Sequence, residues 1–380
     1  MSTLTRTIKC KLAPSPEVAT ALHETMTRFA DACNAVAAVA WQKHTANKYT
    51  LQRLCYANIR DHFGLSANLA IRAIARVAAA YKRDKNQRPT FRPTSVDYDA
   101  RIFRMVGVDA VSLTTTTGRV QIPLILGDYQ RRWLTGDETS ATLTERNGTF
   151  FLHVVVKTES PAPSGDNPVG VDLGLKNIAT TSNGLRFSGR KARHIRRGYW
   201  KRRQSLQAKG TKGARRVLKR LRGRESRWMR DLNHVISRRI VDSLKPGQML
   251  VFEDLKHIRT RIKATKRTRR ELHSWAFGQL FSFCSYKAAE RGIAVVQVDP
   301  RNTSRACPRC GCVEKTNRNG HLFSCVSCGY RQNADVNAAF NIAVAYRAAA
   351  MGCPSCSPEV SDPAPAGAPG TSSRLLAASS

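Results

Sequence analysis

The sequence predicts a multidomain protein in which an α+β half precedes an α/β half. The first observation is that helix-like apolar spacing in residues 13–87 gives way to alternating, β-rich runs in residues 88–160. The second is a proline-rich stretch, residues 159–168, which is typical of a linker between domains. The third is a cluster of cysteines within residues 303–330, set between a strand and a helix of the second half.

The N-terminal elements begin with a strand, because residues 4–12 alternate between apolar and polar side chains. Ser15 and Pro16 then provide a capping hydroxyl and a proline at the first helical position. Apolar residues recur at spacings of three and four up to about Lys43, which predicts one long helix. Two further helices are predicted over residues 51–63 and 66–82.

Short runs rich in β-branched and aromatic residues, broken by Gly, Asp and Asn turns, fill residues 90–157. They predict a small β-barrel or sheet, which the strand at residues 4–12 completes. Residues 1–12 and 88–160 are therefore expected to form one β-domain that carries the helical segment of residues 13–87 as an insert.

After the linker, three short strands separated by Gly and Asn turns predict an antiparallel meander over residues 169–187. Residues 186–230 then hold nineteen Arg or Lys and one acid, Glu225, in a helix that is expected to continue to Leu244. The later elements are predicted as a strand over 249–252, a helix over 271–291, a strand over 293–298 and a helix from about Ala334. Residues 352–380, rich in Pro, Ser, Ala and Gly, predict a disordered tail.

The charge of the chain indicates a polyanionic partner. Its 380 residues include 63 Lys plus Arg and 27 Asp plus Glu, a formal net charge of +36. An apolar fraction of 42% is enough to fill real cores, which excludes a disordered basic tail protein. There is no signal-peptide pattern and no apolar run of membrane-spanning length, so we expect an intracellular protein that contacts no membrane.

Four of the eleven cysteines have the spacing of a metal site. Cys307 and Cys310 form one Cys-x-x-Cys pair, and Cys325 and Cys328 form a second pair after fourteen intervening residues. Two such pairs supply four thiolates to one tetrahedral zinc ion and leave no position for water, so we expect one structural Zn²⁺. Cys312 lacks the pair spacing and is not counted as a ligand.

Cysteines outside this cluster are not expected to bind metal. Cys353 and Cys356 have the pair spacing but no second pair nearby, and they lie in the predicted tail. The scattered cysteines read as small buried apolar groups, and they are Cys10, Cys33, Cys55 and Cys284.

Three acids stand out in a chain with few of them. Asp172 lies in a predicted strand, Glu253 ends another strand, and Asp335 begins a helix. Acids so placed can converge on one edge of a central sheet and hold two divalent ions about 4 Å apart, as in phosphodiester hydrolysis. The alternatives for single residues are a helix cap for Asp335 and a surface ion pair for Glu253.

Three segments resemble the RuvC motifs of the transposon-encoded TnpB (OrfB) family, which the compact type V CRISPR effectors share. They are Val169-Gly-Val-Asp172-Leu-Gly-Leu-Lys-Asn, Val251-Phe-Glu253-Asp-Leu and Asn333-Ala-Asp335-Val-Asn-Ala-Ala-Phe-Asn-Ile. Thr303-Ser-Arg-Ala-Cys-Pro-Arg-Cys-Gly is similar to the start of the family's zinc ribbon. One departure is that Gln332-Asn333-Ala334 stands where many members have a His-Asp-Arg-like run, which points toward the effector-like relatives.

The resemblance implies a domain layout. Residues 1–12 and 88–160 would form a β-barrel wedge domain, and residues 13–87 a helical recognition domain. Residues 168–302 and 331–351 would form an RNase H-like RuvC nuclease domain, with the zinc ribbon of residues 303–330 inserted. Asp172, Glu253 and Asp335 match the catalytic acids that hold two Mg²⁺ ions, and the four paired cysteines match the ribbon's zinc ligands.

The implied activity is RNA-guided DNA cleavage by a monomer on one guide RNA, in the cytoplasm and associated with the nucleoid. A double-stranded target with a short adjacent motif would be cut by two-metal-ion hydrolysis. The basic helical region would contact nucleic acid, and its candidate residues are Arg196, Arg197, Lys201, Arg202, Arg203, Arg215, Arg216, Lys219 and Arg220.

Other functions stay open at this point. They are a compact CRISPR type V effector, a nuclease-inactive guided repressor, a zinc-ribbon protein that binds nucleic acid structurally, and a guide-free RNase H-like resolvase or transposase. Tyr199, Trp200 and Trp228 lie among the basic residues and either stack on bases or pack the helices onto the sheet.

Overall fold

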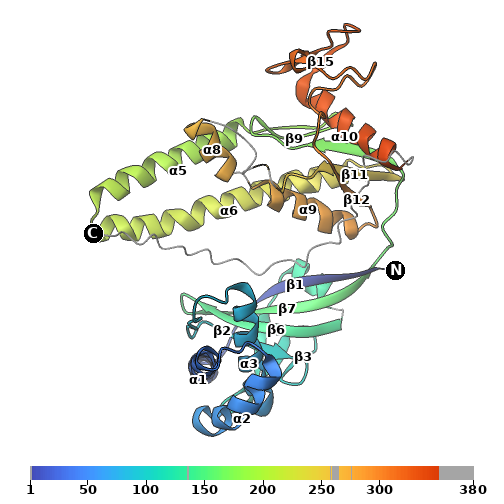
Figure 1. Ribbon diagram of the computed structural model, residues 1–380. Coiled ribbons are helices and arrows are strands. Elements are labelled where there is room, and N and C mark those ends of the chain that lie inside the picture. Colours follow the sequence, from blue (N-terminus) through green and yellow to red (C-terminus); the bar gives the residue numbers. More distant parts are fainter. Residues whose placement is uncertain (1, 135–136, 257, 259–264, 275, 351–380) are drawn as a thin grey trace. The chain divides into compact units, whose positions relative to one another are not determined.

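The computed structural model describes residues 2–134, 137–256, 258, 265–274 and 276–350 (Figure 1). The chain divides into two compact units, an N-terminal unit of Thr3–Glu159 and a C-terminal unit that begins at Ser160. This boundary falls at the start of the proline-rich stretch. The predicted tail, with Cys353 and Cys356, lies outside the described residues.

Two of the three long helices of the N-terminal unit are capped by a side chain. Ser15 accepts a hydrogen bond from the Val18 N–H at the start of the first helix. Asn47 caps the second helix through the N–H groups of Tyr49 and Thr50, so this helix begins three residues earlier than its apolar spacing predicts. The helices are α1 (Pro16–Gln42), α2 (Lys48–Phe63) and α3 (Ala67–Arg83).

The N-terminal unit also contains a seven-stranded sheet in the order β2-β6-β7-β1-β5-β4-β3. As predicted, the first strand completes the sheet, since β1 lies between β7 and β5. A short helix, α4 (Asp128–Trp133), was not expected from the apolar pattern. The strands are β1 (Ser2–Leu12), β2 (Ser95–Asp99), β3 (Phe103–Val106), β4 (Ala110–Thr115), β5 (Gly118–Ile125), β6 (Asp137–Arg146) and β7 (Thr149–Ser160).

The C-terminal unit is built on a five-stranded sheet in the order β10-β9-β8-β11-β12. The predicted meander is confirmed, because β8 pairs antiparallel with β9, and β9 with β10. By contrast, β11 runs parallel to both β8 and β12. The strands are β8 (Asn167–Asp172), β9 (Asn177–Thr181), β10 (Arg186–Ser188), β11 (Gln248–Glu253) and β12 (Val295–Val298).

Side chains of β11 alternate between two cores, because successive strand residues point to opposite faces. Leu250 and Phe252 face a core that contains Leu280 of α9 and residues of α6. Met249 and Val251 face a second core with Ile342 of α10. The sheet therefore has α6 and α9 on one face and α10 on the other (Figure 1).

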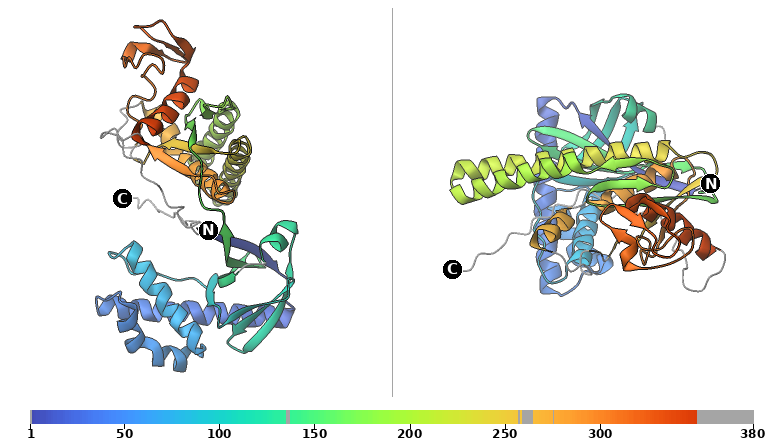
Figure 2. Two further views of the ribbon diagram at one scale, coloured as in Figure 1. Left: turned by 90° about the vertical axis from the view of Figure 1, so that its right-hand side faces the viewer. Right: turned by 90° about the horizontal axis from the view of Figure 1, so that it is seen from above.

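The long basic helix predicted over residues 186–244 is two helices. Gly210 adopts φ +63° and Thr211 caps the next helix through the Ala214 N–H, so the chain turns back on itself (Figure 2). The predicted helix over 271–291 is likewise replaced by two helices. The bounds are α5 (Arg190–Lys209), α6 (Lys212–Asp242), α8 (Lys266–Ser274), α9 (Phe277–Ala289) and α10 (Ala334–Ala350).

A small three-stranded sheet, β13-β14-β15, which we call the ribbon sheet, follows β12 and leads directly into α10. Its elements are the 3-10 turn Lys315–Asn317, β13 (Arg318–Asn319), β14 (Leu322–Ser324) and β15 (Arg331–Asn333). Within the ranges described above, no helix combines the length and apolar character needed to cross a membrane.

Candidate active site and metal centre

Asp172 and Glu253 stand at the C-terminal ends of adjacent parallel strands. Val171 pairs with Phe252 in the register of β8 and β11, which makes the two carboxylates neighbours at one edge of the sheet. Glu253 lies two residues beyond Val251, so its side chain points to the face that α10 covers.

Asp335 reaches the same edge from the first turn of α10. Asn333 begins this helix, since its Oδ1 accepts hydrogen bonds from the N–H groups of Asp335 (3.2 Å) and Val336 (3.3 Å). The helix lies against β8 at Gly170, where a Cβ atom would come within 2.0 Å of the Ala339 carbonyl oxygen. Glycine at this position therefore allows α10 to bring its first turn to the sheet edge.

The three carboxylates line one pocket of about 900 Å³, which we call the carboxylate pocket. Its wall also holds cationic side chains, and they are Lys176, Arg301 and Arg318. The ligand atoms of the four paired cysteines all lie within 4.8 Å of one another. Among the described residues, the oxygens of the three carboxylates are not as close together as these sulfurs. The pocket thus combines carboxylates with cationic side chains.

Hydrogen-bond donors orient two of the acids. Arg318 Nη2 donates to Asp335 Oδ1 (3.0 Å), and Asn177 Nδ2 donates to Asp335 Oδ2 (2.8 Å). Thr303 Oγ1 donates to Glu253 Oε1 (2.5 Å). The sequence interpretation missed these three partners. Asn177 and Thr303 lie inside the quoted motifs, but a motif does not say which side chain a residue meets across the fold.

Burial and mutual repulsion govern the ionisation of the acids. Burial, followed by the charges of Glu253 and Asp335, raises the pKa of Asp172 to about 8, although Arg318 opposes the shift. Burial also raises the pKa of Glu253, against the hydrogen bond from Thr303 and the charge of Arg318. A divalent cation would relieve this repulsion, and oxygen donors of this kind suit Mg²⁺.

Two asparagines of α10 bind the backbone of the segment just before the cysteine cluster. Asn341 Nδ2 donates to the carbonyl oxygens of Thr303 and Ala306, both at 2.7 Å. Asn337 Nδ2 donates to the Ala306 carbonyl oxygen at 3.1 Å. Thr303 also contacts Glu253, so these hydrogen bonds connect α10, which carries Asp335, to Glu253 as well.

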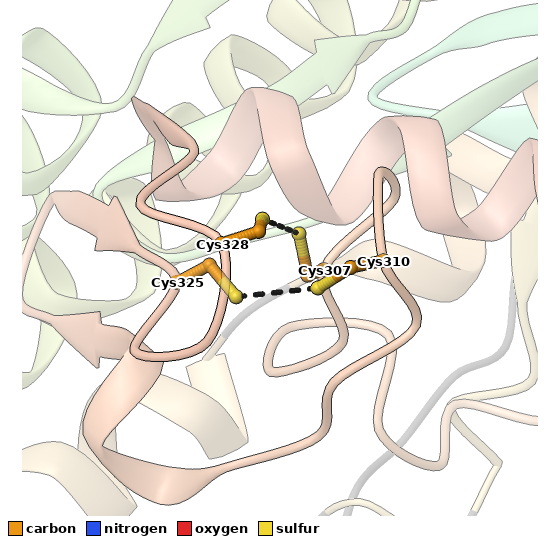
Figure 3. Close-up of side chains that lie close together, drawn as sticks. All are labelled: Cys307, Cys310, Cys325 and Cys328. Carbon is orange, nitrogen blue, oxygen red and sulfur yellow. Dashed lines mark hydrogen bonds between the residues drawn. The ribbon is translucent and has the colours of Figure 1, made fainter.

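The four paired cysteines form a compact cluster (Figure 3). Cys307 Sγ lies 3.6 Å from Cys328 Sγ, and Cys310 Sγ lies 3.5 Å from Cys325 Sγ. Sulfurs bound tetrahedrally at 2.3 Å from a zinc ion are about 3.8 Å apart, whereas a disulfide bond is about 2.05 Å long. The spacing and the donor set therefore suit one zinc ion.

Each cysteine pair is followed by a glycine that the local turn requires. Gly311 and Gly329 adopt φ +77° and +70°, and their N–H groups donate to the carbonyls of Cys307 and Cys325. Asn317, which is 1% exposed, joins the pairs. Its Nδ2 donates to the Cys312 carbonyl (3.2 Å), and its Oδ1 accepts from the Val326 N–H (3.0 Å).

The described cysteines outside the cluster agree with the sequence prediction. Cys312 is not part of the four-thiol group, and its backbone carbonyl accepts a hydrogen bond from the Cys307 N–H. The four scattered cysteines are buried, and burial raises the pKa of Cys10 to about 11 and that of Cys33 to about 12.

The candidate nucleic-acid residues separate into two groups. Arg196 and Arg203 are half-buried, and Arg203 forms an ion pair with Glu225 of α6. Trp228 packs against the core beneath the sheet, which favours the packing role for this aromatic residue. The exposed residues, on α5 and α6, are Arg197, Lys201, Arg202, Arg215, Arg216, Lys219 and Arg220.

Family models match two consecutive parts of the chain. A model described as a probable transposase (OrfB_IS605) matches residues 151–271, and a model described as the Cas12f1-like TNB domain matches residues 277–342. The first match contains Asp172 and Glu253, and the second contains Asp335 and the four paired cysteines.

Similar proteins carry related names. A TnpB-like protein of Methanocaldococcus jannaschii is 29% identical over 63% of this chain and 92% of its own length. The CRISPR-associated endodeoxyribonuclease Cas12f1 of Sulfoacidibacillus thermotolerans is 34% identical over 46% of this chain, but the match spans only 45% of that protein. A putative RNA-guided DNA endonuclease of Streptomyces pristinaespiralis is 32% identical over 56% of this chain and 54% of its own length.

Solved structures share the fold. The Cas12f1 chain in a complex with sgRNA and target DNA aligns with a TM-score of 0.60 at 15% identity, over 90% of this chain and 99% of that chain. The mini-RNA-guided endonuclease CRISPR-Cas phi3 aligns with a TM-score of 0.54 at 10% identity, over 90% and 92%. The chain is thus related to TnpB-like proteins and to Cas12f1 endodeoxyribonucleases, which confirms the resemblance to the TnpB (OrfB) family that its motifs predicted.

Proposed function

We propose that this protein is an RNA-guided DNA endonuclease encoded by a transposable element, with one nuclease site formed by Asp172, Glu253 and Asp335. The observation that carries the proposal is the convergence of these acids in one pocket from motifs far apart in sequence. Two come from neighbouring parallel strands and the third from a helix packed on the same face. This arrangement is poor for a protein that only holds nucleic acid, because the acids repel phosphate.

The proposed nuclease domain is RNase H-like and of the RuvC type, over residues 168–302 and 331–351. The sheet order, with a meander followed by two parallel strands, supports this assignment. We assign residues 303–330 as its zinc ribbon, residues 1–12 and 88–160 as a wedge domain, and residues 13–87 as a recognition domain. Residues 352–380 remain a predicted tail.

Two Mg²⁺ ions held by Asp172, Glu253 and Asp335 would activate a water molecule and stabilise the leaving 3′ oxygen, giving 5′-phosphate ends. The chain's own residues prepare the site. Thr303 fixes the orientation of Glu253, and burial of Asp172 makes its charged form depend on a nearby cation. Arg318, which donates to Asp335, also lines the pocket and would attract the phosphate backbone.

The proposed partners are one guide RNA and a double-stranded target, bound by a monomer that contacts no membrane and acts in the cytoplasm at the nucleoid. The exposed cations of α5 and α6 support nucleic-acid binding, because each neutralised phosphate releases counterions. The Cas12f1 chain of similar fold was solved with sgRNA and target DNA.

Two alternatives differ in context or activity rather than in fold. A compact CRISPR type V effector would share the same site, and the similar proteins include both a TnpB-like protein and Cas12f1 endodeoxyribonucleases. The genes beside the one for this chain would separate a transposon from a CRISPR context. A nuclease-inactive guided repressor would lack one of the acids, whereas all three are present and line one pocket.

The first test is to purify the chain, sequence the RNA that copurifies, and measure cleavage of a plasmid that carries the matching target. We expect cleavage with Mg²⁺ and none with EDTA. Asp172→Asn should abolish cleavage but retain the RNA. Asp166→Asn, an exposed carboxylate just before the other end of β8, is the matched control and should cut like the wild type. Cleavage by Asp172→Asn would refute the assignment of the site.

A further inference from the structure

A second pocket of about 480 Å³ adjoins the carboxylate pocket in the C-terminal unit. Gly174 and Leu175, in the loop after Asp172, line both pockets. Helices α5, α6 and α8 supply most of the remaining wall. We call it the arginine pocket after the side chains that line it, which are Arg190, Arg193, Arg196, Arg197, Arg203 and Arg270.

The charge of the arginine pocket is positive but not uniform. Glu225 and Glu271 are its two acidic side chains, against six arginines. Glu225 pairs directly with Arg203, so this part of the wall is internally neutralised. Arg196, which is half-buried, interacts electrostatically with both Glu225 and Glu271. The excess charge therefore comes from four exposed side chains and suits an anion; they are Arg190, Arg193, Arg197 and Arg270.

The pocket also has an apolar floor. Leu280, which is 1% exposed, lines it with Leu175, Ile178 and Met229. A site for inorganic phosphate alone needs no apolar surface and far less space. The volume lies in the range of pockets that enclose small organic ligands, and an apolar floor beneath cationic walls fits a ligand with both a flat apolar part and an anionic part.

Trp200 gives the pocket a stacking element. The Arg270 guanidinium lies over the Trp200 ring, 4.1 Å from the ring centroid. A guanidinium held over an aromatic face can still donate its N–H groups to a phosphate. Trp200 and Arg270 together therefore present an aromatic surface beside a phosphate donor, the two elements that single-strand binding sites combine.

We propose that the arginine pocket binds one unstacked nucleotide of a single DNA strand and so anchors that strand where it enters the carboxylate pocket. The base contacts Trp200 and the apolar floor, and the backbone phosphate contacts Arg270 and the arginines of α5. This inference rests on the proposed nuclease function, because it makes the anchored strand the one that is cut. It adds a subsite formed by residues on α5 and α8, separate from the three acids.

The test uses the RNA-bound complex of the Asp172→Asn chain, which retains the site without cutting. Binding of a fluorescein-labelled 12-nucleotide single-stranded DNA is measured by anisotropy as a function of salt. Trp200→Ala should weaken binding by about 5- to 100-fold with little change in salt dependence, since it removes stacking and no charge. Trp200→Phe should keep most of the affinity.

Arg270→Gln is compared with Arg224→Gln, an exposed arginine of α6 that does not line the pocket. Both substitutions remove one charge, so equal losses of affinity would mean that only net charge matters and would overturn the proposal. A larger loss for Arg270→Gln supports it. Photocrosslinking with 5-iododeoxyuridine should attach the strand to Trp200, and attachment only to peptides outside the pocket would contradict the assignment.

Two further arms identify the ligand. The mononucleotide dAMP should compete at least 100-fold more weakly than the DNA strand; equal competition would mean a free-nucleotide site and would overturn the strand anchor. Tighter binding of a single-stranded RNA than of the DNA strand would also overturn the proposed DNA anchor. If Trp200→Ala binds normally while the wild type still cuts its target, the anchor is wrong and the nuclease assignment stands. If Trp200→Ala weakens DNA binding but the wild type does not cut its target, the strand anchor stands and the nuclease assignment is wrong.

Discussion

Arg318 Nη2 lies 3.0 Å from Asp335 Oδ1, so a cation of the ribbon sheet contacts an oxygen that a divalent ion would use. The other oxygen of Asp335 accepts from Asn177. Without a divalent ion, the positive charge of Arg318 thus partly balances the acids of the carboxylate pocket. Arg318 also lowers the pKa of Asp172 and Glu253, in opposition to burial.

Arg318→Gln should therefore bind divalent ions more tightly in the absence of nucleic acid. Removal of one nearby positive charge at a partly exposed site changes the binding free energy by about 1 kcal/mol, or roughly fivefold. Titration of the RNA-bound protein with Mn²⁺ in a calorimeter measures this change. Arg305→Gln, an exposed arginine outside the pocket lining, is the control and should bind Mn²⁺ like the wild type. Weaker Mn²⁺ binding by Arg318→Gln would mean that Arg318 helps to build the site rather than compete with the metal.

Stability without metal should fall as pH rises through the neutral range. The pKa of Asp172 is about 8 in the folded protein and near 3.8 when the group is unperturbed, so between these values the folded state binds the extra proton. A raised carboxyl pKa contributes stability that is fully present below about pH 4 and is lost as pH approaches 8. In EDTA, the Tm of the wild type should drop more between pH 5 and pH 8 than that of Asp172→Asn.

Mg²⁺ should restore the wild-type Tm at pH 8, because the ion compensates the charges that burial disfavours. Asp166→Asn controls for the loss of an acid just before β8 and should follow the wild-type curve. Parallel pH curves for the wild type and Asp172→Asn would show that Asp172 ionises normally in the folded protein.

Close packing of α10 on β8 makes Gly170→Ala strongly unfavourable. The new Cβ would lie 2.0 Å from the Ala339 carbonyl oxygen and 2.9 Å from the Ala343 nitrogen, so the helix must shift. Overpacking of this kind costs about 1–3 kcal/mol, and the shift moves Asp335 away from Asp172. Thermal unfolding and plasmid cleavage should both be impaired. Gly198→Ala is the control: Gly198 lies inside α5, and beyond the backbone of its own helix and its chain neighbours no atom lies within 4 Å of the new Cβ. This substitution should stabilise the protein by about 0.5–1 kcal/mol.

The features that could be predicted from the sequence are those set by residues close together in the chain. The helix start at Ser15 and the two cysteine pairs are set by local spacing, and the structure contains both. The meander and the strand that ends at Glu253 also follow from short apolar runs between turns. These signals act within a few residues, so one chain is enough to read them.

Features set by contacts between distant segments were missed or misread. The turn at Gly210 was interpreted as continuous helix, because basic residues continue on both sides of it. Arg318 and Thr303 were not linked to the acids, since their contacts with Asp335 and Glu253 depend on how the ribbon packs against α10. The burial of Arg203 against Glu225 likewise appears only when α5 and α6 are paired in space.

The four-cysteine cluster should hold one zinc ion that the C-terminal unit needs for stability. Cys310→Ala removes one of four ligands, so the purified protein should contain well under one zinc ion per chain and should unfold at a lower temperature. Cys312→Ala is the matched control, because Cys312 is a neighbouring thiol that lies outside the cluster, and it should keep its zinc. Metal content is measured by inorganic mass spectrometry and stability by thermal unfolding. The ribbon sheet leads directly into α10, so loss of zinc should also displace Asp335 and lower cleavage. Full zinc content in Cys310→Ala would rule out the four-thiolate site.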